Sequence, residues 1–187
     1  MTEPAKTVLF SGHMTDAPDR TAPRFPADKV LQAQDAISAI LRKWGVRSGD
    51  LCICGGARGG DILFAEACLE LGARLEIVLA LPVDAFLETS VQGEPELNWP
   101  ARFERLLAYA HVVPATPTDP YKSPFADCNA RMIARAFKAS QSPGQGTLHM
   151  LLLWDGKGGD GPGGTADFAR RGDAAGAQVH IIDPANM

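Results

Sequence analysis

Short apolar segments alternate with helical segments along the chain, and this alternation constrains the fold more than any other feature. The apolar runs are rich in Leu, Ile and Val, and each is followed by polar or turn-forming residues. The predicted strands are Thr7–Phe10, Leu51–Cys54, Leu75–Leu81, His111–Ala115, Leu148–Trp154 and Val179–Ile182. Between them, apolar residues recur at the spacing of one helix face. The predicted helices are Asp28–Trp44, Asp61–Leu71, Asp84–Thr89, Trp99–Ala110, Pro124–Ala139 and Thr165–Ala175.

Strands that are apolar on both faces and alternate with helices form parallel sheets that are covered on both sides. Because crossovers between parallel strands are right-handed, the sheet becomes doubly wound. The sequence therefore predicts an α/β fold with a doubly wound, mostly parallel, Rossmann-like sheet of five to six strands and helices on both faces. A length of 187 residues predicts a single domain spanning residues 1–187.

Composition narrows the classes of partner. The net charge of −4 argues against a nucleic-acid partner, which requires a basic face. No apolar run approaches the roughly 18 residues that a membrane span needs, and no basic start precedes an apolar stretch as in a signal peptide. We therefore expect a cytoplasmic protein with no membrane partner.

The four cysteines do not indicate a metal site. Cys52 and Cys54 form a C-x-C pair within an apolar run, which is compatible with a metal or redox pair or with small buried apolar residues. The second interpretation is favoured, because the histidines and acidic residues show no metal-ligand spacing. The sequence predicts no metal and no bound cofactor.

Glycine-rich loops follow three of the predicted strands, at Ser11–His13, Gly55–Asp61 and Asp155–Thr165. The carboxyl ends of parallel strands meet at one edge of the sheet, where ligands bind. Glycine lets the backbone turn tightly, and free amides at the start of the next helix attract anions. We expect the three loops to form one site for a nucleotide-type ligand. The loop Gly55–Asp61 contains neither a Gly-Lys-Ser/Thr sequence nor G-x-G-x-x-G spacing, so NAD is not favoured.

Individual side chains in these loops have specific candidate roles. Arg58 can hold a phosphate through two hydrogen bonds, and Asp61 can bond a ribose hydroxyl or cap its own helix. Elsewhere, Tyr121 and Asn129 are candidate base contacts. The predicted ligand-binding residues are Ser11, Gly12, His13, Gly55, Gly56, Arg58, Gly59, Gly60, Asp61, Asp155, Gly156, Gly163, Gly164 and Thr165.

Two carboxylates are candidates for catalysis. Glu66 lies in an apolar helical stretch, where a carboxylate can serve in acid–base chemistry or reach towards solvent or a neighbouring loop. Asp61 begins the same helix beside the glycines. Either residue, or Asp167, could supply the carboxylate that an N-glycosidic hydrolase needs.

The glycine loops resemble those of known families. The segment Gly55–Asp61, GGARGGD, is similar to the G-G-A-x-G-x-D turn of the DNA-processing protein A family. Gly163–Thr165 resembles the glycine-rich loop of the LOG family of phosphoribohydrolases. Together they identify the chain as a member of the SLOG superfamily, which implies a Rossmann-like nucleotide-binding domain and, from LOG-like relatives, a homodimer.

One departure from the LOG pattern bears on activity. The pattern P-G-G-x-G-T-x-x-E carries its catalytic glutamate three residues after the threonine, where this chain has Phe168 beside Asp167. Three hypotheses follow. The favoured one is a sensor or binding domain for a nucleotide-derived ligand. The others are an N-glycosidic hydrolase or phosphoribosyl or ribosyl transferase acting on nucleoside phosphates, and a protein-interaction module without a ligand.

Overall fold

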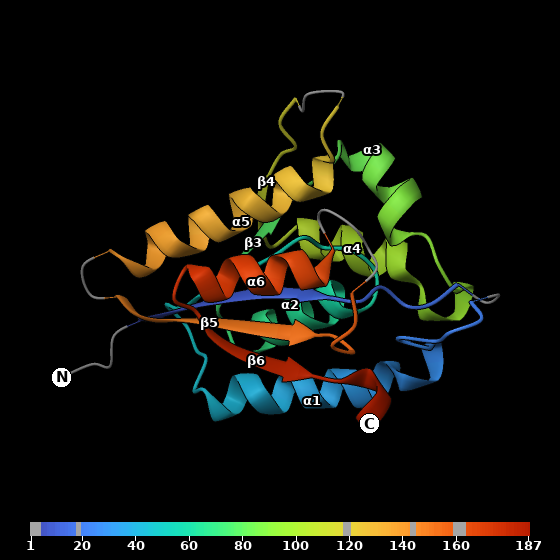
Figure 1. Cartoon of the computed structure of the whole chain (residues 1–187), viewed down its shortest axis with the longest axis horizontal. Coiled ribbons are helices and arrows are strands. Elements are labelled where there is room, and N and C mark those ends of the chain that lie inside the picture. Colours follow the sequence, from blue (N-terminus) through green and yellow to red (C-terminus); the bar gives the residue numbers. More distant parts are fainter. Residues whose placement is uncertain (1–4, 18–19, 118–120, 143–144, 159–163) are drawn as a thin grey trace.

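A six-stranded, all-parallel sheet forms the centre of the computed structural model (Figure 1), which describes residues 5–17, 20–117, 121–142, 145–158 and 164–187. The strand order is β4-β3-β2-β1-β5-β6. The strands are β1 Ala5–Gly12, β2 Leu51–Cys54, β3 Arg74–Val78, β4 His111–Val113, β5 Gln145–Leu153 and β6 Gln178–Ile182. This order confirms the predicted doubly wound, Rossmann-like fold.

Helices cover both faces of the sheet (Figure 1). On one face α2 packs against both α1 and α4, whereas α5 and α6 pack together on the other. The helices are α1 Val30–Lys43, α2 Gly60–Glu70, α3 Val83–Phe86, α4 Trp99–Leu107, α5 Pro124–Ser140 and α6 Thr165–Ala174; short helical turns lie at η1 Ala27–Lys29, η2 Leu87–Val91, η3 Pro95–Leu97 and η4 Pro184–Asn186.

The central strands are buried on both faces, as their apolar runs predict. All four residues of β2 are buried, and so are Val8, Leu9 and Phe10 of β1. The ring of Phe10 stacks on Phe64 of α2, with ring centres 4.6 Å apart. The four cysteines are buried and form no disulfide. Cys52 and Cys54 therefore contribute to the core as small apolar side chains.

Five of the six strands differ from their predicted bounds at one end or both, and strand pairing explains two of these differences. The third strand ends at Val78 and not at Leu81, because its partner β4 offers only three residues and the register ends at Val78 opposite Val113. The first strand extends to Gly12, because β5 continues beside it as far as Leu153. Strand length is thus set by the neighbouring strand as well as by the apolar run.

The direction of winding reverses between β1 and β5. From β1 the chain proceeds through β2 and β3 to the β4 edge, and α5 then crosses the opposite face to reach β5 on the other side of β1. The carboxyl ends of β1 and β5 therefore border the crevice in which open α/β sheets bind ligands.

Within the described residues, no helix has both the length and the apolar character that a membrane crossing requires. The prediction of a single domain over residues 1–187 stays a prediction.

Candidate functional site

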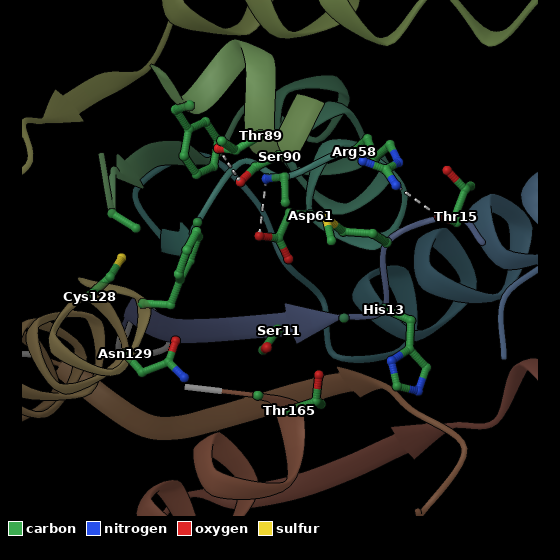
Figure 2. Close-up of a pocket in the computed structure, with 18 of the residues that line it drawn as sticks. Ser11, His13, Thr15, Arg58, Asp61, Thr89, Ser90, Cys128, Asn129 and Thr165 are labelled. Carbon is green, nitrogen blue, oxygen red and sulfur yellow. Dashed lines mark hydrogen bonds between the residues drawn. The ribbon is translucent and has the colours of Figure 1, made fainter. Parts of the chain in front are cut away.

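A cavity of about 640 Å³ opens at this reversal point, a volume in the range of small-molecule sites. Its walls come from both sides of the sheet: the loops after β1 and β2, the α3–η2 segment, and the first turns of α5 and α6 (Figure 2). The lining residues are Ser11, Gly12, His13, Met14, Thr15, Asp16, Ala17, Arg20, Arg24, Gly55, Ala57, Arg58, Asp61, Ala80, Phe86, Thr89, Ser90, Ser123, Phe125, Cys128, Asn129, Met132, Gly164 and Thr165.

The structure brings together residues from all three predicted loops. Those that line the cavity are Ser11, Gly12 and His13 from the first loop, Gly55, Arg58 and Asp61 from the second, and Gly164 and Thr165 from the third. Gly163 lies outside the described residues. Gly56, Gly59, Gly60, Asp155 and Gly156 are described but do not line it.

The glycines of the second loop serve close backbone packing. Gly59 has φ +80° and ψ −126°, a conformation that is strained for any residue with a side chain. A Cβ atom at Gly59 would lie 2.8 Å from the amide nitrogen of Thr15 and 2.9 Å from the carbonyl oxygen of His13. The loop after β2 can therefore touch the loop after β1 only because this position has no side chain.

The amides of this loop are engaged by the protein itself. The amide of Arg58 donates to the carbonyl of Ser90 at 2.9 Å, and the amide of Gly60 donates to the carbonyl of His13 at 3.1 Å. The amide of Ala57 donates to the carboxylate of Asp61 at 3.3 Å. This differs from the predicted role, in which the loop amides are free for a phosphate.

Asp61 occupies the centre of the cavity floor (Figure 2) and is only 8% exposed. Burial raises the pKa of its carboxyl to about 7, against the opposing effect of nearby backbone amides, above all that of Ala57. Its Oδ1 is buried and has no hydrogen-bond partner among the described residues. A carboxyl group in this state can accept a hydrogen bond from a ligand when ionised and donate one when protonated.

His13 and Asp155, predicted as separate ligand contacts, are in contact with each other. Nε2 of His13 lies 3.1 Å from Oδ1 of Asp155, and Nε of Arg24 lies 3.3 Å from Oδ2. Although burial opposes ionisation of Asp155, hydrogen bonds from the Lys157 amide and His13, together with the charge of Arg24, hold its pKa below the ordinary value. Asp155 therefore orients His13 from outside the cavity. Gly156 is exposed at the following turn.

Arg58 is held at the edge of the cavity by the loop after β1. One terminal nitrogen, Nη2, donates to the carbonyl of Thr15 at 3.4 Å, whereas Nε is buried without a partner among the described residues (Figure 2). A buried donor without a partner costs free energy, so a ligand that accepts this hydrogen bond gains affinity. Arg58, the predicted anion contact, lines the cavity.

Glu66 lies outside the cavity. It packs between α2 and α4, where its carboxylate accepts hydrogen bonds from Arg102 at 2.9 and 2.5 Å and from Arg105 at 3.1 Å. The guanidinium of Arg102 also stacks over the ring of Trp99, 4.4 Å from its centre. These contacts make Glu66 a buried ion-pair partner between two helices, which is neither the acid–base role nor the contact with solvent or a loop considered for it, and separate it from Asp61 as a candidate for chemistry.

Several lining residues were not predicted as ligand contacts. Phe86, Thr89 and Ser90 come from the α3–η2 segment, and η2 is a π-helical turn, a form that often occurs at functional sites. Arg20 and Arg24 lie in the long loop between β1 and α1. Because ligands bind beyond the carboxyl ends of the strands, the position of this loop after β1 could have indicated both residues.

Of the two candidate base contacts, one lines the cavity and the other does not. Asn129 is 6% exposed and lines the cavity, whereas Tyr121 is 95% exposed and lies outside it. Among the described residues, no three His, Cys, Asp or Glu side chains are grouped so that they could hold a metal ion.

Comparisons with known proteins find similarity in fold only. No protein-family model matches the chain, and no curated protein matches it in sequence. Among solved structures, the structural genomics target TM1055 is similar over 93% of this chain and 72% of its own, with 16% identity and a TM-score of 0.47.

Two further solved structures resemble the chain. DNA processing protein A (DprA) from Streptococcus pneumoniae is similar over 95% of this chain and 58% of its own, with 14% identity and a TM-score of 0.40. The Moco carrier protein from Chlamydomonas reinhardtii is similar over 98% of this chain and 92% of its own, with 14% identity and a TM-score of 0.38.

Proposed function

We propose that the chain binds a nucleotide or a nucleotide-derived small molecule in the cavity at the carboxyl ends of β1 and β2 and acts as a binding or sensing domain. The observation that carries the proposal is the uneven distribution of side chains along this cavity. Apolar groups gather at the α5 end and cationic groups at the β1-loop end, with hydroxyl and carboxyl groups between them (Figure 2). A nucleotide has the same order of parts: a flat base, a hydroxylated sugar and an anionic phosphate.

The α5 end suits a base. Phe125, Cys128 and Met132 lie on one side of α5, and all three line the cavity. Phe125 is 39% exposed, which leaves part of its ring available for stacking on a planar ligand. The amide of Asn129 adds a donor and an acceptor for the edge of a base.

The other end suits a phosphate. His13 and Arg58 lie there (Figure 2), and Arg20 and Arg24, which come from the same loop as His13, also line the cavity. Between the two ends, α6 begins at Thr165, which lines the cavity, and its N-cap residue Gly164 provides no side-chain cap. The unpaired amides and the dipole of a helix start favour an anion. Asp61 and Ser11, in the middle, are positioned for sugar hydroxyls.

Thermal and chemical denaturation in the presence of nucleotides tests the proposal. A nucleotide that binds this site should stabilise the protein by about 2.7 kcal/mol at 100 times its dissociation constant. Replacement of Arg58 by Gln should weaken binding about tenfold or more, because a hydrogen bond to a charged group is lost. Arg42→Gln, at the distant C-terminal end of α1, is the matched control and should bind as the wild type does.

Absence of stabilisation by every nucleoside, nucleotide and sugar phosphate would refute the proposal and would favour the protein-interaction module. Equal effects of Arg58→Gln and Arg42→Gln would place the ligand elsewhere on the molecule. The two measurements together therefore test both the class of ligand and the location of its site.

The protonation state of Asp61 supports a second candidate function, N-glycosidic hydrolysis of a nucleoside phosphate. A carboxyl with a pKa of about 7 at the cavity floor is suited to proton transfer at neutral pH. Asp167 is a weaker candidate, because Arg170 and Arg171 pair with it. Release of free base that is lost in Asp61→Asn and kept in Glu66→Gln would support hydrolysis. Intact nucleotide after prolonged incubation would leave binding alone.

A further inference from the structure

A second hollow of about 280 Å³ shares part of its wall with the larger cavity, which we call the nucleotide cavity after the function proposed for it. Its residues are Arg20, Ala22, Pro23, Arg24, Asp155, Lys157 and Gly158, and we refer to it as the arginine pocket. Arg20 and Arg24 line both spaces. A ligand that extends from the nucleotide cavity past these two side chains would therefore enter the arginine pocket.

The charges of the arginine pocket favour an anionic group. Three cationic side chains, Arg20, Arg24 and Lys157, line it with one carboxylate, Asp155. Asp155 interacts with Arg24 and with His13, which itself lines the nucleotide cavity. The pair of spaces is thus connected by side-chain contacts as well as by shared walls, and the balance of charge in the pocket is positive.

The shared arginines are held in place before any ligand binds. The Nη2 of Arg24 donates to the carbonyls of Lys157 at 3.3 Å and Gly158 at 3.0 Å, and its side chain is only 11% exposed. Arg20 donates to the carbonyl of Ala22 at 3.0 Å and lies 3.4 Å from the carboxylate of Asp16. A guanidinium that is already ordered loses little freedom when it binds phosphate oxygens.

We propose that the arginine pocket is a subsite for the second half of a nucleoside diphosphate ester, with the pyrophosphate lying against Arg20 and Arg24. This inference rests on the proposed nucleotide site and specifies its ligand class. The base and first sugar occupy the larger cavity, and the group esterified to the second phosphate enters the arginine pocket beside Lys157. A nucleoside monophosphate fills the first space alone.

Isothermal titration calorimetry of matched probe pairs tests the inference: AMP with ADP-ribose, UMP with UDP-glucose and GMP with GDP-mannose. The diphosphate ester of the preferred base should bind about tenfold or more tightly than its monophosphate, because added phosphate oxygens meet charged donors. Lys157→Ala should reduce this ratio by several-fold and leave monophosphate binding unchanged. Lys157→Arg should restore it, and Lys43→Ala at the end of α1 is the matched control.

The outcomes separate the two proposals. If the monophosphate binds but the diphosphate ester binds no more tightly, with Lys157→Ala without effect on either, the arginine pocket is not a subsite and the nucleotide site stands. If neither probe of any pair binds, the nucleotide site itself is refuted and the subsite with it. If Lys157→Ala weakens both probes equally, the pocket serves the first phosphate and the inference is overturned.

Discussion

Gly59 and Asp61 lie two positions apart in the loop after β2, and their roles differ. Gly59 permits contact between two backbone loops, since a side chain there would collide with His13 and Thr15. Asp61 is placed by that contact at the floor of the cavity, where burial changes the pKa of its carboxyl. One residue shapes the site through its lack of a side chain, and the other provides its central functional group.

Replacing Gly59 by Ala should destabilise the fold strongly. We expect a loss of about 3 kcal/mol in the free energy of unfolding, because backbone strain and a backbone collision act together. Gly45→Ala is the control: Gly45 also has a positive φ, +65°, but no atom lies within 4 Å of the added Cβ. The Gly45→Ala substitution should lower the free energy of unfolding by about 1 kcal/mol. Similar losses in both variants, measured by urea denaturation, would contradict the role assigned to Gly59.

Asp61 should make stability depend on pH in a predictable direction. Its pKa is raised in the folded state, from 3.8 to about 7, so folding favours the protonated form. The contribution of Asp61 to the free energy of unfolding is therefore complete below about pH 4. It decreases by up to about 4 kcal/mol as the pH rises to 7. The difference in unfolding free energy between wild type and Asp61→Asn should follow this curve. A difference that stays constant from pH 4 to pH 8 would argue against a raised pKa.

At the scale of elements, the helix starts and the connections between strands build the site. α5 begins at Pro124 after a Ser123 cap, which accepts a hydrogen bond from the Ala126 amide, and this turn lines the cavity. On the opposite face, Glu66 joins α2 to α4 through Arg102 and Arg105. Both features position α-helices relative to the sheet, but only the first contributes groups to the cavity.

Glu66→Gln should reduce stability and leave ligand binding unchanged. Loss of the carboxylate leaves Arg102, which is 21% exposed, without its partner and should cost about 2 kcal/mol. Arg105→Ala should cost less than about 1 kcal/mol, since Arg105 is 66% exposed and exposed ion pairs contribute little. Denaturation and nucleotide titration of both variants provide the measurements. A loss of binding or hydrolysis with unchanged stability would return Glu66 to the functional site.

At the scale of the whole molecule, the cavity exists because segments far apart in the sequence meet at one edge of the sheet. Ser11, Asp61, Asn129 and Thr165 come from four different parts of the chain and surround one space (Figure 2). The homodimer implied by LOG-like relatives stays a prediction, which light scattering can test.

Hydrogen exchange should report this convergence. A nucleotide bound in the cavity should slow amide exchange together in residues 11–17, 55–61, 123–129 and 164–168, because each segment contributes to the wall. Arg58→Gln, at a ligand concentration where binding is lost, should show no such protection. Protection confined to one of the four segments would indicate a surface contact and not a ligand enclosed by the cavity.

The sequence by itself determined the fold class and the edge at which the site lies. Apolar runs alternating with helical spacing require a covered parallel sheet, and the glycine-rich loops follow strands whose carboxyl ends must meet. These inferences depend only on local periodicity and on the chirality of the chain, which are readable from residues near one another in sequence.

Only the tertiary structure decided what each residue does at that edge. Whether Glu66 faces the cavity or Arg102, and whether the amide of Gly60 is free or bonded to His13, depends on partners far away in the sequence. The same holds for Asp155, which contacts His13 and Arg24. Hydrogen bonds, ion pairs and burial are properties of groups brought together by folding, so local sequence patterns could not assign them.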